Sequence, residues 1–258
     1  MEAVISHPWN VTIQKAKEIQ LSLSKRVLLK PLLKKVLLLA AVDVSYTRWD
    51  KQGYAVLGIF SIRYDNSDGL IRIKEEVIYT RKDRVNFPYV PGYLSFREIP
   101  MLLPLFEKVD IKPDVLLVDG VGIAHPRRFG LAAHLGVLYD IPSIGCAKSR
   151  LVGVYEEPAA KKGSLTKLVF KGEEVGVVLR SKDNCKPLFV SPGNKCNVES
   201  AANLVLKCCS KYRLADPIRR VDAISKEIRK GDNSSSVSRQ YSNQSLSYSD
   251  GTIERGEK

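Results

Sequence analysis

The sequence predicts a single α/β domain in which a mixed β-sheet is flanked by helices. Three strand-like runs follow one another early in the chain, Val36–Tyr46, Tyr54–Tyr64 and Leu70–Thr80. Helix-like and strand-like segments then alternate up to about residue 230. The chain has 258 residues, of which 44% are apolar and 27% charged, and shows no internal repeat. This length and composition suit one sizeable core.

The first element is predicted to be a helix, and a three-stranded meander follows it. An apolar pattern with helical spacing begins after Pro8, and Asn10 or Thr12 can cap the helix. Gly53 and the polar stretch Asp65–Gly69 punctuate the three strands as hairpin turns. Because strands joined by short turns pair antiparallel, we expect the meander at one side of the sheet.

The second half of the domain alternates helices and strands. Glu98–Val109 has a helical apolar face, although Pro100 and Pro104 disturb it, and Asp114–Asp119 is a short buried strand. The remaining predicted elements are the helix Leu131–Tyr139, the strands Pro142–Ala147, Leu165–Phe170, Glu174–Arg180 and Pro187–Val190, and the helices Asn197–Tyr212 and Pro217–Arg229. Three strands followed by helix, strand, helix and strand is the order of a ribonuclease-H-like core.

Composition argues against several classes of protein. The longest uninterrupted apolar run, Val36–Val42, is far shorter than the ~20 residues that span a bilayer. Met1–Asn10 lacks the basic start and apolar block of a secretory signal, so we expect a cytoplasmic or nuclear protein without membrane association. An odd number of cysteines without Cys-x-x-Cys spacing argues against disulfides and structural zinc. The expected reduced cysteines are Cys146, Cys185, Cys196 and the helical pair Cys208 and Cys209.

Charge and composition divide the chain into a basic body and a polar tail. The net charge is +13, which favours a polyanionic partner such as nucleic acid. The segment from Gly231 to Lys258 is rich in Ser, Asn, Gln and Gly and poor in aliphatic residues. Because such a segment cannot bury enough apolar surface to offset its ordering entropy, we predict a domain over residues 1–230 and a disordered tail over 231–258.

Two aspartates stand at the ends of apolar strands. Asp43 follows the run LLLAAV, and Asp119 follows VLLV. A carboxylate in such surroundings costs several kcal/mol unless it is paired or binds a metal. Two strands that each deliver an aspartate suit a two-metal phosphodiesterase, with Mg²⁺ or Mn²⁺ as the oxygen-seeking ion. The alternative is that one aspartate only caps a turn, as the pair Asp119–Gly120 could.

Two further acids are candidates for the same cluster. Glu98 lies three residues after Ser95, which is the spacing of a capping box at the start of a helix. Asp222 follows Val221 on the final helix, in an arginine-rich segment where a solvated ion pair is the alternative. Spacing alone leaves both readings open for each residue.

Long motifs in this chain resemble the endonuclease V family. The most specific is DGVGIAHPRRFG at residues 119–130, continued by IPSIGCAK at 141–148. VDVSY at 42–46 and PYVPGYLSFRE at 88–98 precede it in the family's order, and YRLADPIR at 212–219 resembles its closing segment. The resemblance covers the chain from about the first helix to residue 230.

The resemblance implies a metal-dependent endonuclease that cuts a phosphodiester bond on the 3′ side of inosine and leaves 3′-hydroxyl and 5′-phosphate ends. Asp43, Glu98 and Asp119 would bind the metal, and Asp222 falls where relatives place a fourth acid or a histidine. Lys148 corresponds to a lysine near the scissile phosphate. Mg²⁺ is the expected ion, and Mn²⁺ is expected to substitute for it.

The resemblance also implies how the base is recognised. The turn Pro88–Tyr89–Val90–Pro91 corresponds to a wedge between bases, and two prolines around an aromatic make a stiff tip for this purpose. The residues that map onto the hypoxanthine pocket are Leu94, Gly122, Ile123, His125 and Gly130. Glycines allow backbone groups to approach a flipped base closely.

One segment departs from the family's pattern. Asn194 and Lys195 stand where relatives usually carry histidine and arginine, which puts any phosphate or pocket role of that pair in doubt. We expect a monomer that acts on inosine-containing DNA or RNA, and no motif announces contacts to 2′-hydroxyls. The rival hypotheses are a non-catalytic reader of inosine and a generic ribonuclease-H-type enzyme that needs no inosine.

Overall fold

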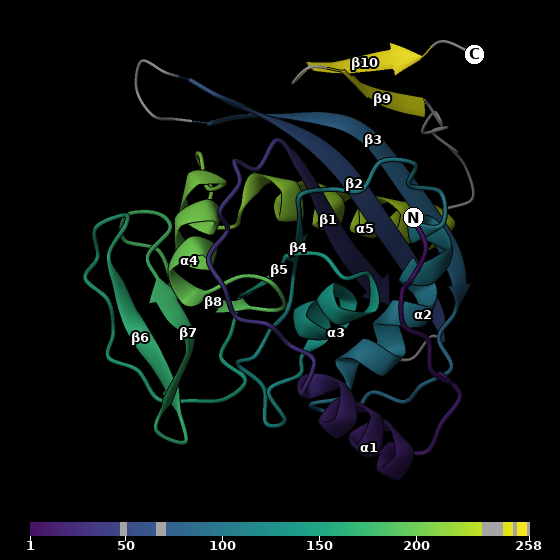
Figure 1. The fold of residues 1–258 in the computed structure, drawn as a ribbon, viewed down its shortest axis with the longest axis horizontal. Coiled ribbons are helices and arrows are strands. Elements are labelled where there is room, and N and C mark those ends of the chain that lie inside the picture. The colour runs from purple at the N-terminus through teal and green to yellow at the C-terminus, as the bar shows by residue number, and fades with distance from the viewer. Residues whose placement is uncertain (47–50, 66–70, 234–244, 250–251, 257–258) are drawn as a thin grey trace.

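An eight-stranded mixed β-sheet forms the centre of the molecule (Figure 1). The computed structural model describes residues 1–46, 51–65, 71–233, 245–249 and 252–256. The strands of the main sheet are β1 (Leu38–Tyr46), β2 (Gln52–Tyr64), β3 (Ile71–Arg84), β4 (Val115–Val118), β5 (Ser143–Ala147), β6 (Leu165–Phe170), β7 (Glu173–Leu179) and β8 (Leu188–Pro192). The helices are α1 (Ile13–Ser24), α2 (Leu94–Phe106), α3 (Leu131–Leu138), α4 (Val198–Lys207) and α5 (Asp216–Asn233).

The strand order is β3-β2-β1-β4-β5-β8-β7-β6. The predicted meander is confirmed, because β1, β2 and β3 pair antiparallel at one side of the sheet. β1, β4 and β5 are parallel to one another, and β8, β7 and β6 continue the sheet antiparallel. Because β1 and β4 are parallel neighbours, both end at the same edge of the sheet. This is the predicted ribonuclease-H-like α/β fold.

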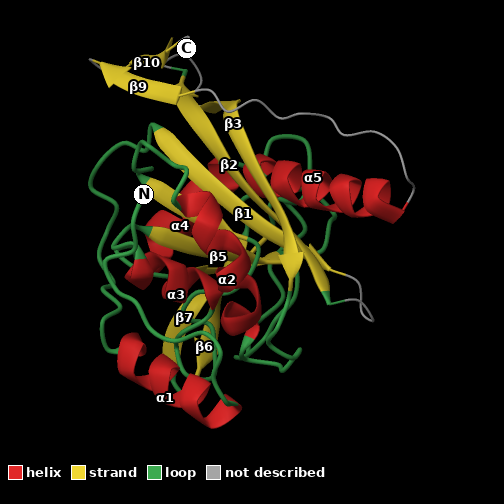
Figure 2. Ribbon diagram, turned by 90° about the vertical axis from the view of Figure 1, so that its right-hand side faces the viewer, coloured by secondary structure: helices red, strands yellow, loops and turns green. Residues whose placement is uncertain are grey.

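Helices cover both faces of the sheet, and the alternation along β1 explains which face each residue meets. Leu39 and Ala41 pack in a core with α4 and α5, whereas Leu38, Ala40 and Val42 pack with α2 and α3. Figure 2 shows α5 on one side of β1 and β2, with α2 and α3 on the other. Since side chains alternate along a strand, the residue after Val42 must face α5.

Some element boundaries differ from the sequence prediction. Thr12 caps α1 as expected and accepts a hydrogen bond from the backbone N–H of Lys15 at 3.2 Å. Gly53, predicted as a turn residue, lies inside β2 and pairs with Tyr46. Most of the second predicted turn, residues 66–69, lies outside the described residues. α4 ends at Lys207, so the two adjacent cysteines follow the helix instead of lying on it; all five cysteines are free.

Residues 231–258 form the tail that the sequence predicts to be disordered. Within it the structure describes the end of α5 and two short strands, β9 (Ser245–Ser249) and β10 (Thr252–Gly256). Among the described strands, these two pair only with each other. The domain boundary at residue 230 stays a prediction. No helix in the described part of the chain is both long and apolar enough to cross a membrane.

A half-buried histidine, His7, and a buried one, His134, tie the N-terminal segment to α3. His134 is fully buried, and its Nε2 lies 2.8 Å from Nε2 of His7. The rings of Trp9, Phe96 and Phe129 surround His134, with centroids 4.8–5.5 Å away. Burial lowers the pKa of His134 well below its usual value, so the ring is neutral. We call these residues the histidine cluster.

Candidate active site

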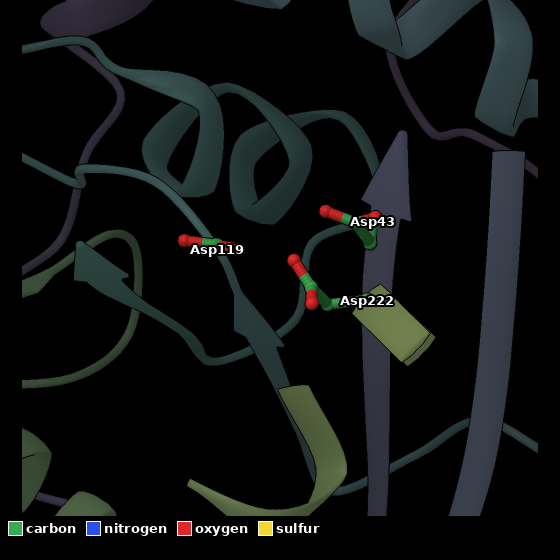
Figure 3. Close-up of side chains that lie close together, drawn as sticks. All are labelled: Asp43, Asp119 and Asp222. Carbon is green, nitrogen blue, oxygen red and sulfur yellow. The ribbon is translucent and has the colours of Figure 1, made fainter. Parts of the chain in front are cut away.

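Three aspartates meet at the edge where β1 and β4 end (Figure 3). Val42 of β1 is paired with Val118 of β4, so Asp43 and Asp119 are neighbours one step further along. Both face α5, which delivers Asp222. One ligand oxygen from each carboxylate lies within 4.8 Å of the other two. We call these three residues the acid cluster.

Burial sets the protonation of Asp43. The pKa of its carboxyl is raised to about 6, mainly by removal from water, and the charges of the neighbouring Asp119 and Asp222 act in the same direction. Ser225 of α5 donates its hydroxyl hydrogen to Oδ2 of Asp43, which acts in the opposite direction. A nearby cation would favour the charged form of this crowded carboxyl.

A lysine lies between the other two aspartates. Nζ of Lys148, from the loop after β5, is 2.5 Å from Oδ2 of Asp119 and 3.0 Å from Oδ1 of Asp222. Burial lowers the pKa of Lys148, but the two carboxylates outweigh burial and raise it above its usual value. Burial raises the pKa of Asp119 despite this lysine. The pKa of Asp222 is lowered because hydrogen bonds from Lys226 and Lys148 outweigh its partial burial.

Glu98 lies beside the acid cluster but is not one of its three members. Of the two readings left open for Glu98, the capping box does not hold, because α2 begins at Leu94 with Tyr93 as its N-cap. Ser95 is therefore inside the helix, and its buried hydroxyl has no partner. Glu98 is 7% exposed, and burial, with the charges of Asp43 and Asp119, raises its pKa well above the usual value. It approaches from the α2 side of the sheet, whereas the aspartates lie on the α5 side.

A cavity of about 360 Å³ is lined both by one member of the acid cluster, Asp119, and by the turn that precedes α2. Its wall includes Asp119 and Lys148 as well as Tyr89, Val90 and Pro91. Pro88, Tyr89 and Pro91 are exposed. Tyr89 is 67% exposed, more than any other aromatic residue among the exposed large hydrophobic residues that the structure describes. The predicted wedge thus protrudes beside a cavity that reaches the carboxylates.

The predicted pocket residues fall into two groups. Leu94, His125 and Gly130 line the cavity. Gly122 and Ile123 lie behind its wall: Ile123 is 1% exposed, and a Cβ on Gly122 would lie 2.0 Å from the carbonyl oxygen of Pro192. Gly122 is therefore required by close packing against the end of β8. Direct contact of these two residues with a base stays a prediction.

His125 is held neutral by its surroundings. Its pKa is lowered to about 4, mainly by burial; the guanidinium of Arg127 acts in the same direction, and a hydrogen bond to Gly92 acts against it. Nε2 lies 2.9 Å from the carbonyl oxygen of Gly92, and Nδ1 accepts from the N–H of Arg127 at 3.2 Å. Both nitrogens are engaged, so this histidine shapes the cavity and does not transfer protons at neutral pH.

The residues that depart from the family pattern have a structural explanation. Asn194 is 2% exposed, and its amide accepts from the N–H of Leu28 at 3.1 Å and donates to the carbonyl of Gly136 at 2.9 Å. Lys195 forms an ion pair with Asp140 at 2.6 Å. Asn194 thus joins α3 to the segment after α1, and neither residue lines the 360 Å³ cavity.

Several cavity residues were not identified from the sequence. They are Gln20, Tyr46, Gly92, Ser95, Gly120, Val121, Leu131, Ala147, Ser149, Arg150 and Leu151. Ser149 to Leu151 directly follow Lys148, so their position next to a predicted site residue could have indicated that they line the cavity. Gln20 lies on α1, far from every motif, and nothing in the sequence marks it.

The fold is similar to the solved structures of several nucleases. The crystal structure of endonuclease V from Streptomyces avermitilis is 34% identical, covers 89% of this chain and 98% of its own, and has a TM-score of 0.77. The catalytic domain of human endonuclease V is 31% identical, with 88% and 99% coverage and a TM-score of 0.75. An endonuclease V from Ciona intestinalis, in complex with a 24mer DNA containing an inosine followed by a ribo-adenosine, is 30% identical, with 85% and 98% coverage and a TM-score of 0.71. The chain is therefore an α/β nuclease.

The family follows from sequence comparison. The model of the family Endonuclease V matches residues 21–223. The endonuclease V of Dictyoglomus turgidum is 43% identical over 211 residues, which are 82% of this chain and 88% of that protein. The chain belongs to the endonuclease V family, whose members are metal-dependent nucleases that hydrolyse phosphodiester bonds.

Proposed function

We propose that this protein hydrolyses the phosphodiester bond on the 3′ side of inosine in DNA or single-stranded RNA, with Mg²⁺ as its metal. The observation that carries the proposal is the single cavity that joins Asp119 and Lys148 to the protruding Tyr89. A base lifted from its stack at the turn would thereby place the adjoining phosphate beside the carboxylates. The Ciona intestinalis relative, which binds inosine-containing DNA, supports the same substrate.

The residues at the acid cluster fit a divalent cation. Three carboxylates offer oxygen atoms within 4.8 Å of one another, and such hard oxygen donors are what Mg²⁺ and Mn²⁺ prefer. The ammonium of Lys148 already stabilises two of them, which shows that the cluster attracts positive charge. Asp43, Asp119 and Asp222 would hold the ion, with Glu98 at the border of the site. When bound, the ion supplies activation of water and stabilisation of charge on phosphate oxygens.

The chain's own groups orient the substrate. Lys148 lies at the rim of the cavity and can place its positive charge on a phosphate oxygen, where negative charge grows during hydrolysis. Backbone groups of the predicted pocket would distinguish hypoxanthine, which carries an O6 acceptor and an N1–H donor, from adenine, which presents the reverse pattern. Tyr89 supplies an exposed ring for stacking on the neighbouring base.

A cleavage assay tests this function. A labelled oligonucleotide with one inosine should be cut at one position 3′ to the inosine in Mg²⁺, and the cutting should stop when EDTA is added. Asp43→Ala should bind the oligonucleotide and fail to cut it. Binding of inosine without cleavage by the wild-type protein would instead indicate a non-catalytic reader. Cutting of a hybrid duplex without inosine would indicate a generic ribonuclease-H-type enzyme.

Matched substrates test whether the enzyme prefers DNA or RNA. Inosine-DNA, inosine-RNA and DNA with one ribose next to the inosine should be compared at equal concentrations. Recognition of RNA depends on contacts to a 2′-hydroxyl. If the enzyme prefers RNA, DNA with a single ribose next to the inosine should therefore be cut nearly as fast as inosine-RNA. The DNA bound by the Ciona intestinalis relative carries such a ribose after the inosine. Action as a monomer, in the cytoplasm or the nucleus, belongs to the same proposal.

A further inference from the structure

The protruding turn Pro88–Pro91 is held at its C-terminal end by contacts to one carbonyl group, that of Gly92. The carbonyl oxygen of Gly92 is approached by Nη2 of Arg127 at 2.6 Å, Nε2 of His125 at 2.9 Å and Nε2 of Gln20 at 3.1 Å. Gly92 has a φ of +81°, a conformation that side chains rarely adopt, and a Cβ there would lie 3.0 Å from the Arg127 guanidinium. The position and direction of this carbonyl are therefore set by three side chains at once.

Gln20 connects the donors to one another. Its side chain is fully buried although it comes from α1, more than seventy residues before the turn. Its Oε1 accepts from Nε of Arg127 at 2.5 Å, and its Nε2 also lies 3.4 Å from the carbonyl oxygen of Phe129. The amide thus orients Arg127 with one end and contacts Gly92 with the other.

The other end of the turn is held separately. Nη1 of Arg97 donates to the carbonyl oxygen of Phe87 at 2.7 Å, and its guanidinium lies 4.3 Å from the ring centre of Tyr46. Phe87 and Gly92 therefore anchor the two sides of a turn whose tip, Tyr89, is 67% exposed. An exposed tip on two fixed ends can transmit force into a base stack without bending.

We propose that Gln20 is a positioning residue for strand separation: by holding Gly92 and Arg127, it keeps the tip rigid enough to open a base-paired substrate. The proposal rests on the proposed function. Unstacking a duplex step costs a few kcal/mol, whereas an inosine in a single strand is already accessible. Loss of Gln20 should therefore penalise duplex substrates more than single strands.

The test compares Gln20→Leu with Gln14→Leu, the same change on the exposed face of α1, where the side chain contacts Glu18 at 3.4 Å. We expect Gln20→Leu to lower kcat/KM about tenfold on duplex inosine-DNA. On the single strand we expect a loss of less than about threefold, which corresponds to ~1 kcal/mol or less of activation free energy. Gln14→Leu should match the wild type on both. If Gln20→Leu fails to fold, Gln20→Glu keeps the acceptor for Arg127, removes the donor to Gly92 and should show the same selective loss.

Several results would overturn the proposal. Equal loss on both substrates would mean that Gln20 contacts the base or supports the fold in general. A wild-type enzyme that cuts single strands but no duplex would remove the strand-separating role itself, and one that cuts no inosine substrate would remove the proposed function instead. Independently of activity, hydrogen exchange at the Tyr93 amide, which bonds to the Val90 carbonyl at 3.0 Å, should accelerate in Gln20→Leu alone. Unchanged exchange there would also contradict the proposal.

Discussion

The acid cluster and the histidine cluster both bury ionisable groups beside the same sheet, but they satisfy them differently. The carboxylates of Asp43 and Asp119 are of like charge and depend on the Lys148 ammonium, and burial raises their pKa values. His7 and His134 are neutral, and their ring nitrogens bond to each other among aromatic rings. Crowded like charges favour the binding of a cation, whereas two neutral rings that bond to each other among aromatic side chains fit a role in packing, even though Nδ1 of His134 has no partner.

The largest effect that separates the two clusters is expected for Asp119→Asn. We expect cleavage to fall about a thousandfold or more, since ~4 kcal/mol of lost stabilisation corresponds to three powers of ten. The metal-free protein should become slightly more stable, because burial disfavours the charged carboxylate. Cleavage rates and thermal unfolding measure the two effects. Asp83→Asn, at a surface ion pair with Arg81, is the matched control and should change neither.

His134→Ala should show the opposite combination. The ring is fully buried among Trp9, Phe96 and Phe129, and removing a buried aromatic ring costs about 3 kcal/mol. Urea unfolding measures this loss, while cleavage per folded molecule in Mg²⁺ should stay within about threefold of wild type, an allowance of under ~1 kcal/mol. A thousandfold loss of cleavage in a folded His134→Ala protein would contradict the separation of the two clusters.

The two clusters should also respond to pH with opposite slopes. The folded-state pKa of Asp43 is raised to about 6, so its contribution to stability is present at low pH and is lost as the pH rises through 6. The pKa of His134 is lowered, so its contribution is present above its usual pKa and is lost as the pH falls.

Urea midpoints of the metal-free protein, measured between about pH 4.5 and 8, report both slopes. Relative to Asp43→Asn, the wild type should lose stability as the pH rises. Relative to His134→Phe, it should lose stability as the pH falls. Parallel profiles for wild type and either variant would be evidence against that cluster's titration.

The smallest effect is expected for Lys226→Met. Lys226 pairs with Asp222 at 2.6 Å across one helical turn, but it is exposed, and such pairs contribute only about 0.5 kcal/mol. Thermal unfolding should change by a degree or so and cleavage by less than about threefold. A loss of cleavage as large as the one expected for Asp119→Asn would contradict this minor role of Lys226.

The sequence was most informative where local pattern decides structure. Thr12 capped α1 as predicted, and Asp43 and Asp119 were singled out because each directly follows a run of apolar strand residues. The capping interpretation of Glu98 failed because a helix start depends on the preceding loop: α2 begins at Leu94, before Ser95 can act as a cap. Gly53 failed for a related reason, since a glycine in a strand looks like a glycine in a turn.

Amino-acid order alone determined the sheet-and-helix class, the two aspartates at strand ends and the family motifs, because periodicity and strand length are local properties. Only the tertiary structure decided that Asp222 joins Asp43 and Asp119 while Glu98 stands at the border. That outcome depends on which face of the sheet α5 and α2 cover. The same holds for Gln20, whose partners Gly92 and Arg127 lie 72 and 107 residues away, a separation that no local pattern encodes.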